Sequence, residues 1–289
     1  MSAAMGLGQA GPVRAASGPA AAARITELEV GFSGAYKLGH WIPVRLNVAG
    51  GEKGFSGSVE LNTVDNNAVN TRFVAAAAHP LKVAPGEQWS GWRYLKAGRL
   101  AAPIQVRLRS EAGSVVDTRI MEDGVPHPST CQWILNTGPK VGVEEAKAFL
   151  ARMKNQPVVS SVLTDPRDFP EHWIGYEGVS MMLVPTGTES VLERLRPRQF
   201  SALMRWLRLG GRMVLSAGRR AETLFAPNHP FHALRPGQYV ELDPYWKASG
   251  LENFARAAEP IRMDKGSRLA VFSDVRGRTV CFEGAGGGQ

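Results

Sequence analysis

The residue whose position most resembles that of a catalytic nucleophile is Ser216. It closes the predicted strand RMVLSAG, just ahead of a predicted helix, which is the context of a nucleophile elbow. The elbow also needs a glycine two residues earlier, but this chain has Val214 there, and a β-branched side chain resists the strained backbone. A serine nucleophile further needs a base. An enzyme here would have to combine Ser216 with Asp165 and with either His172 or His229, and we expect no catalytic site of this kind.

Carboxylates gather in one proline-rich loop, where Asp165, Asp168 and Glu171 fall within seven residues. Such a group could serve acid–base or metal chemistry, but acids in such a loop more often form turns and cap helices. No glycine-rich phosphate loop follows any predicted strand, and no Cys/His spacing suggests zinc. We therefore expect no metal and no cofactor.

The loops that follow the predicted parallel strands are small and polar. Ligands of open parallel sheets bind at the carboxyl ends of the strands, so a ligand of this region would meet a rim formed by Asn136, Thr137, Asp165, Arg167, Asp168, Thr186, Ser216 and Arg219. The alternative is that these loops are ordinary turns, because turns require the same residue types. Both interpretations stay open at the level of sequence.

The first half of the chain predicts strands. Seven short runs alternate apolar and polar residues and are separated by turn signals at the spacing of an all-β sandwich: RITELEVGF, WIPVRLNVAG, GSVELNTV, VNTRFVAAA, EQWSGWRYLKA, APIQVRLRS and VVDTRIM. We predict an antiparallel, Ig-like β-sandwich over residues 24–122, after an Ala/Gly/Pro-rich leader at 1–23 that is disordered. Its core candidates are Trp41, Phe73, Trp89 and Trp92; an aromatic platform for carbohydrate is the alternative use of these rings.

The pattern changes at Cys131, after the prolines of EDGVPHPST at residues 122–130. Strand and helix periods then alternate through CQWILNTG, VEEAKAFLARMKN, PVVSSVLTD, VSMMLVPTG, PRQFSALMRWLRLGG and RMVLSAG, and a hairpin of RLAVFSDV and RTVCFE follows. This order predicts an α/β domain over residues 131–289 with a flavodoxin-like parallel sheet.

The helix that begins at Pro197 is amphipathic. Phe200, Leu203, Met204 and Leu207 fall on its predicted inner side, and a basic patch of Arg198, Arg205 and Arg208 falls on the outer side. The patch is either a solvated helix face or a docking surface for an anionic partner.

The net charge of +8 over 289 residues comes mainly from arginines spread along the chain, which does not resemble a nucleic-acid-binding tail. We expect no sequence-specific nucleic-acid binding.

No apolar run reaches the length of a membrane span, and the N-terminus lacks the cationic start and apolar centre of a signal peptide. Two cysteines, Cys131 and Cys281, are too few for a disulfide framework, so we expect buried free thiols; the alternative, in an oxidising compartment, is one bridge between neighbouring strands.

A family resemblance rests on GAYKLGHWIPVRLNV, LTDPRDFPEHWIGYEGVSMMLVP and QFSALMRWLRLGGRMVLSAG. With these segments residues 25–289 resemble uncharacterised envelope proteins of Planctomycetes-type bacteria, in which a β-sandwich precedes a domain similar to class I glutamine amidotransferases. The resemblance implies an envelope or periplasmic location, with any membrane anchor outside this chain. Active amidotransferases have a cysteine in a G-x-C-x-G elbow and a later H-x-E pair. Here Ser216 replaces the cysteine, Val214 replaces the first glycine, and no H-x-E follows, so the resemblance implies a catalytically empty relative.

The first hypothesis is therefore a non-enzymatic binding or scaffolding protein of the bacterial cell envelope, with a protein or an anionic envelope component as partner. The alternatives are a hydrolase or amidotransferase-like enzyme at the strand-end rim around Ser216, and a carbohydrate-binding protein.

Overall fold

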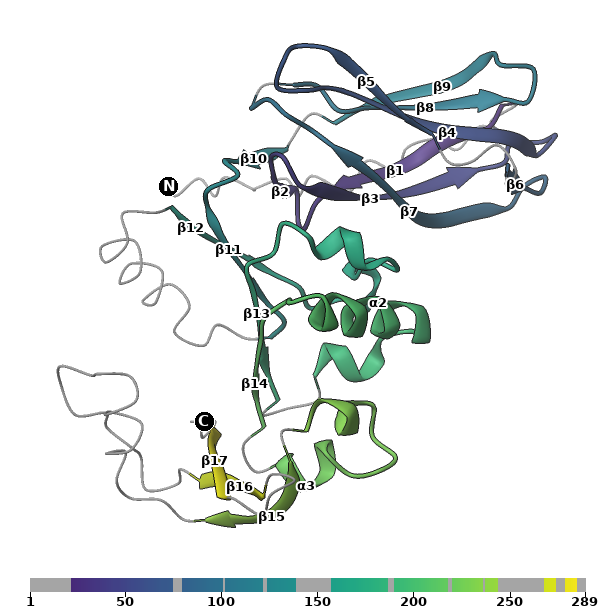
Figure 1. The fold of residues 1–289 in the computed structure, drawn as a ribbon. Helices are drawn as coiled ribbons and strands as arrows, with labels where there is room; N and C mark the ends of the chain where they lie inside the picture. The colour runs from purple at the N-terminus through teal and green to yellow at the C-terminus, as the bar shows by residue number, and fades with distance from the viewer. Residues whose placement is uncertain are drawn as a thin grey trace, which may run out of the picture.

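The computed structural model describes residues 22–74, 80–100, 102–121, 124–138, 157–186, 190–217, 220–235, 237–243, 268–273 and 279–284. These residues form mostly β-strands in several sheets, with few helices (Figure 1).

Residues 22–121 contain two antiparallel sheets, which we call the sheet pair. The first sheet has the order β1-β3-β7 and comprises β1 (Arg24–Val30), β3 (Trp41–Ala49) and β7 (Gln88–Lys96). The second has the order β5-β4-β8-β9, with β6 also paired to β4, and comprises β4 (Phe55–Val64), β5 (Asn70–Val74), β6 (Leu81–Val83), β8 (Gln105–Ser110) and β9 (Val115–Ile120). The seven longer strands confirm the seven alternating runs of the sequence. β6 and β2 (Ala35–Lys37) have three residues each, too few to show a period.

The sheet pair encloses an aliphatic core. Along β3, Val44, Leu46 and Val48 are fully buried while Arg45 and Asn47 between them are partly exposed, as strand alternation requires. Side chains from β1, β3, β4, β7 and β8 join one cluster, and Figure 1 shows the two sheets facing each other.

The four aromatic core candidates lie at the margin of that core or outside it. Phe73 and Trp89 pack against the cluster only partly buried, and Trp41 is also partly buried. Trp92 is buried but belongs to neither hydrophobic cluster; it pairs with Arg45, whose side chain contacts carboxylates on the outer face of the first sheet. Phe73 and Trp89 thus join the core at its margin, as predicted, whereas Trp41 and Trp92 do not belong to it, and strand register fills its centre with aliphatic residues.

A four-stranded parallel sheet follows, within residues 131–235, which we call the parallel-sheet region. Its order is β12-β11-β13-β14, and it comprises β11 (Gln132–Asn136), β12 (Val158–Val162), β13 (Met181–Pro185) and β14 (Met213–Ser216). The four predicted strands are confirmed. The helix predicted within residues 143–155 lies outside the described residues.

Helix α2 (Pro197–Arg208) confirms the second predicted helix. The other helical pieces of this region are short: the 3₁₀ helices η1 (Pro166–Asp168), η2 (Trp173–Tyr176), η3 (Val191–Arg194) and η5 (Pro230–Leu234), and α3 (Ala221–Leu224). A small antiparallel sheet follows, in which β16 (Arg268–Ser273) and β17 (Thr279–Gly284) confirm the predicted hairpin, and the unpredicted β15 (Gln238–Asp243) pairs with β16.

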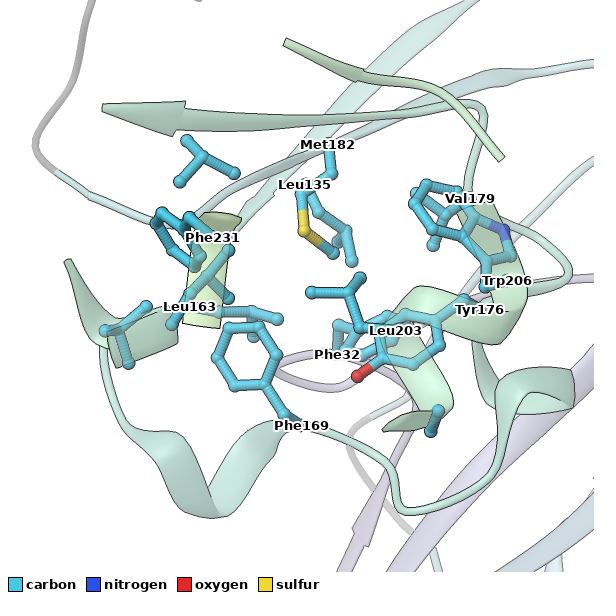
Figure 2. Packing of buried hydrophobic residues seen from close by; sticks show 14 of the residues in the cluster. Phe32, Leu135, Leu163, Phe169, Tyr176, Val179, Met182, Leu203, Trp206 and Phe231 are labelled. Carbon is cyan, nitrogen blue, oxygen red and sulfur yellow. The ribbon is translucent and has the colours of Figure 1, made fainter. Parts of the chain in front are cut away.

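The core of the parallel-sheet region is rich in aromatic rings, among them Phe169, Tyr176, Trp206 and Phe231 (Figure 2). The sheet pair contributes one ring to this core, Phe32, which lies 5.5 Å from the Trp133 ring and 6.0 Å from the Tyr176 ring between centroids. Phe32 sits in a tight turn closed by hydrogen bonds with Ala35. Gly31 precedes it with φ of +72°, and a Cβ there would lie 1.8 Å from the Ala35 carbonyl oxygen, so only glycine fits.

The boundary segment between the two regions is held in place by hydrogen bonds. β10 (Val125–His127) pairs in parallel with β2 (Figure 1). Beyond this strand pair, the Trp41 amide donates to the Glu177 carboxylate at 2.6 Å, and the His172 amide donates to the Tyr94 hydroxyl at 3.0 Å. The expected proline-marked boundary contains a short strand. Near it, η2 packs against β3, and Asp168 at the end of η1 contacts Arg45 of β3.

Among the described residues, none of the helices has the length and apolar character needed to cross a membrane.

Candidate functional site

At the carboxyl ends of the central strands, the rim side chains are buried and bonded within the protein. Asn136 ends β11 and accepts from the Gly138 amide through Oδ1 at 3.3 Å. Thr137 donates to the Leu183 carbonyl through its amide at 3.0 Å and its hydroxyl at 3.2 Å. These contacts join the end of β11 to β13, so both residues position the loop.

Thr186 and Ser216 meet at the next pair of strand ends. Thr186 is fully buried, and its hydroxyl lies 2.5 Å from the Ser216 carbonyl oxygen and 3.3 Å from that of Ala217. Ser216 lies at the end of β14, as predicted, and this bond fixes its backbone. Arg219, the remaining rim candidate at this end, lies outside the described residues.

Asp165 acts as the N-cap of η1. Its carboxylate accepts from the Arg167 amide at 2.8 Å and from the Arg167 guanidinium at 2.7 and 2.9 Å. The Arg167 side-chain hydrogen bonds lower the pKa of Asp165 to about 2. An ionised carboxylate only accepts hydrogen bonds, so Asp165 has no proton to donate at neutral pH.

Asp168 faces the sheet pair. Its Oδ1 lies 3.6 Å from Nη2 of Arg45, which also contacts the carboxylates of Glu27 and Glu29. Burial, followed by the Glu29 charge, raises the pKa of Asp168. The loop turns the Asp168 side chain toward β1 and β3, away from the other rim candidates at the ends of β11 and β13.

The two histidine candidates act as caps of short helices. His172 is exposed, accepts from the Ile174 amide through Nδ1 at 3.4 Å, and has its ring centroid 5.9 Å from that of Tyr94. Burial and the Arg205 charge lower the pKa of His172. His229 accepts from the Phe231 amide through Nδ1 at 3.2 Å, and its Nε2 lies 3.3 Å from the Glu193 carboxylate. Neither ring has a recorded contact with Ser216 in the described part of the chain.

The structure assembles a polar cluster near these strand ends that the sequence analysis missed. Glu193, 13% exposed, pairs through both carboxylate oxygens with the Arg220 guanidinium at 2.9 and 3.0 Å and contacts His229. We call Glu193, Arg220 and His229 the rim cluster. Burial raises the pKa of Glu193, but the hydrogen bonds from Arg220, the Ser190 amide and His229 outweigh it and leave the pKa lowered.

One signal for the rim cluster was present in the sequence. Ser190-x-x-Glu193 is a capping box, in which the Ser190 amide donates to Glu193 at 2.8 Å, and such boxes are recognisable by spacing. The partners Arg220 and His229 carry no comparable signal, since they come from later segments. Chemically the cluster is a carboxylate held by a guanidinium and by a histidine whose two ring nitrogens both have partners, the Glu193 carboxylate and the Phe231 amide.

The basic patch lies on the exposed side of α2, where Arg198, Arg205 and Arg208 are exposed. The Arg205 guanidinium carbon lies 5.9 Å from the Trp173 ring. On the inner side, Leu203 is buried and Phe200 and Leu207 pack against the core, as predicted, while Met204 is only partly buried. The prediction missed Gln199, Ala202 and Trp206, which are also buried. Gln199 is buried because its amide nitrogen donates to the carbonyls of Pro166 and Phe169 at 2.6 and 2.8 Å, which secures the loop around η1.

Within the described ranges, no group of three or more His, Cys, Asp or Glu side chains could hold a metal ion. Cys131 is a buried free thiol, and burial raises its pKa. Nothing is described of the Cys281 side chain.

Several hollows open on the described residues of the sheet pair, and two of them are the more spacious. The first, of about 570 Å³, runs between the edge strands β1 and β9. The second, of about 670 Å³, lies at the end of the sheet pair near the boundary segment and contains Trp41 and Phe73. We call the second one the aromatic hollow.

Comparisons with known proteins add little. A family described as a domain of unknown function (DUF8726) matches residues 24–122, and no curated protein matches the chain. Among solved structures, the DNA glycosylase AlkC of Pseudomonas fluorescens, bound to DNA with an abasic site analog, is 13% identical, with 37% of this chain and 31% of that chain covered and a TM-score of 0.26. The sporulation control protein Spo0M of Bacillus subtilis is also 13% identical, with 37% and 49% covered and a TM-score of 0.24.

A Niemann-Pick type C2 protein from the Japanese carpenter ant is 8% identical, with 37% of this chain and 93% of that chain covered and a TM-score of 0.26. The chain thus spans less than half the length of AlkC and of Spo0M. TM-scores this low support no statement about shared fold or function.

Proposed function

We propose that this protein is a non-enzymatic binding or scaffolding protein of the bacterial cell envelope. In this proposal the sheet pair is an Ig-like sandwich, and the second domain is a catalytically empty relative of the class I glutamine amidotransferase fold. The strand order β12-β11-β13-β14, all parallel, supports a flavodoxin-like arrangement, which has the same 2-1-3-4 order.

The observation that carries the proposal is the engagement of His229. A serine hydroxyl needs a base with a free nitrogen beside it. Nδ1 of His229 accepts from the Phe231 amide, so the ring proton of a neutral imidazole lies on Nε2, which faces Glu193. The residues that would have to act on Ser216 cap short helices instead: Asp165 caps η1, His172 caps η2 and His229 caps η5.

The contact between the two regions supports a scaffolding role. Phe32 lies in the core of the parallel-sheet region, β10 pairs with β2, and Tyr94 accepts from the η2 loop. Separate domains joined by a free linker would move relative to each other. Contacts of this kind hold two binding faces in one orientation.

The basic patch of α2 supports an anionic partner. Three exposed guanidiniums within about three helical turns present positive charge without a carboxylate among the first-turn residues of the helix, and such a patch attracts anionic surfaces. An envelope location places anionic polymers and lipid headgroups within reach of this face.

The test of the catalytically empty rim is an assay of purified protein with glutamine and with p-nitrophenyl esters. Wild type is expected to match the Ser216→Ala variant, with neither above the uncatalysed rate. Ser201→Ala, on the exposed side of α2, is the matched control. Turnover that disappears in Ser216→Ala and persists in Ser201→Ala would contradict the proposal and favour the hydrolase hypothesis.

The test of the anionic partner is co-sedimentation with phosphatidylglycerol vesicles. Binding should weaken as salt rises, since exposed charges are screened over about 10 Å at 0.1 M salt. Replacing Arg198, Arg205 and Arg208 together by glutamine should reduce it further. A matched triple replacement of Arg24, Arg72 and Arg99, exposed residues of the sheet pair, controls for net charge. An equal loss in both triple variants would contradict a role of the patch.

A further inference from the structure

The aromatic hollow has the composition of a ligand site. Its volume of about 670 Å³ falls within the range of about 300–1,000 Å³ that ligand pockets occupy. Leu38 and Ala97 line it and are 8% and 1% exposed, which gives it an apolar floor. It lies where the end of the sheet pair meets Pro128 and Ser129 of the boundary segment.

Two aromatic rings form one wall of this hollow. Trp41 begins β3 in the first sheet and Phe73 lies in β5 of the second. Their centroids are 5.7 Å apart and their planes make an angle of 73°, so the rings meet edge to face and form a corner. Both side chains are only partly buried, so part of each ring surface faces solvent.

The remaining wall is polar. Asp65 accepts from the amides of Asn67 and Val69 through Oδ1; among the described residues its Oδ2 has no hydrogen-bond partner. Asn66 and Lys96 also line the hollow and are exposed. Asp65 and Lys96 carry opposite charges, so the site has donors and acceptors but little net charge.

We infer that the aromatic hollow binds a neutral saccharide. A sugar ring has an apolar C–H face that packs on an aromatic ring and an edge of hydroxyl groups that both donate and accept hydrogen bonds. The aromatic corner can pack against the C–H face of the sugar ring. The side chains of Asp65, Asn66 and Lys96 can form hydrogen bonds with its hydroxyl groups. The inference goes beyond the proposed function, because it concerns the sheet pair and holds whether or not the rim is catalytic.

A purely apolar ligand fits the hollow less well. It would remove water from the Asp65 carboxylate and the Lys96 ammonium without replacing the lost hydrogen bonds, and polar groups left unpaired in this way weaken binding. A strongly anionic ligand would meet the Asp65 carboxylate. A neutral polyhydroxyl ring carries neither cost.

The test is isothermal titration of the full chain with cellohexaose, chitohexaose and maltohexaose, and with sodium octanoate as an apolar probe. At least one hexasaccharide is expected to bind. Trp41→Ala and Phe73→Ala should each weaken that binding about tenfold or more, because ring stacking adds to the lost apolar contact. Trp89→Phe is the control, since Trp89 lies in β7 outside the hollow and stacks on Arg93.

Asp65→Asn and Asn66→Ala test the polar wall without removing an aromatic ring. Asparagine at 65 keeps the Oδ1 acceptor of the turn and turns the second acceptor into a donor, so saccharide binding should weaken while the melting temperature stays within a few degrees. These two variants keep the test decisive if an aromatic variant fails to fold. The inference is overturned if no hexasaccharide binds at millimolar concentration, if octanoate alone binds, or if binding survives all four substitutions in the hollow. Glutamine and ester assays of Ser216→Ala are independent of each of these outcomes.

Discussion

The two hydrophobic cores are filled by different means. In the sheet pair, the core consists largely of valine, leucine and isoleucine at every second position of long strands. In the parallel-sheet region, aromatic rings from short helices and loops make up much of the core, including Phe169 after η1, Tyr176 in η2 and Phe231 in η5. The first core follows from strand period alone, whereas the second depends on how irregular segments are held against the sheet.

Polar contacts follow the same division. In the sheet pair, Glu60 on β4 is 2% exposed and lies among Arg72, Arg107 and Arg109 of neighbouring strands, so register alone brings the charges together. In the parallel-sheet region, Glu193 and Gln199 bond to segments distant in sequence. Such a region holds its shape through a few buried polar side chains.

The largest expected effect comes from the ring that both regions share. Phe32→Ala should lower the free energy of unfolding by about 3–5 kcal/mol, because it removes a buried aromatic ring and leaves a cavity. Denaturant unfolding followed by tryptophan fluorescence measures the loss, and hydrogen exchange locates it. Protection of β11 and β13 amides should fall although residue 32 belongs to the sheet pair. Loss of protection confined to β1 and β3 would show that the two cores are independent.

The next effect concerns the loops that complete the second core. Gln199→Leu leaves the buried carbonyls of Pro166 and Phe169 without their donor, which should cost about 2–3 kcal/mol. The exposed Gln88→Leu is the control and should stay within about 0.5 kcal/mol. Chemical denaturation of both variants compares them. Equal small losses would mean that Gln199 does not secure the η1 loop.

Acid should weaken both regions through their buried carboxylates. Burial raises the pKa of Glu60, but hydrogen bonds from Asn62 and Arg109 outweigh it and leave the pKa lowered, as at Glu193. A carboxyl whose folded pKa lies below its unfolded value of about 4.3 stabilises the protein above that pH, and this contribution is lost as pH falls through the folded pKa.

Glu60→Gln should therefore cost about 1–2 kcal/mol at neutral pH, because it removes charge-assisted hydrogen bonds. The difference from wild type should shrink below about pH 4.3. Unfolding curves of both proteins at a series of pH values check this. A difference that stays constant down to the acid end would show that Glu60 does not titrate with unfolding.

The smallest effect is expected at the exposed rim loop. Arg167→Ala removes an ion pair whose arginine is 77% exposed and should leave the melting temperature almost unchanged, because exposed ion pairs contribute little to stability. It should, however, raise the pKa of Asp165 from about 2 toward its usual value near 3.9. Carbon-detected NMR titration of the carboxyl measures this shift. An unchanged pKa would mean that the backbone amide of residue 167 alone holds the charge.

The sequence by itself determined the strands and their faces. Alternation along WIPVRLNVAG and APIQVRLRS fixes which residues point inward, because strand geometry repeats every two residues regardless of the rest of the chain. The four parallel strands and the helix from Pro197 to Arg208 likewise follow from the alternation of strand and helix periods along the chain. The position of Ser216 at a strand end was predictable for the same reason.

Only the tertiary structure decided which polar residues meet. Arg220 and His229 reach Glu193 from segments about 30 residues away, Asp168 turns toward Arg45, and Phe32 crosses into the other core. Trp41 and Phe73 form a corner because the ends of two sheets approach each other. None of these contacts has a period in the sequence, since each arises from packing irregular segments against sheets, and packing depends on the shape of the whole molecule rather than on neighbouring residues.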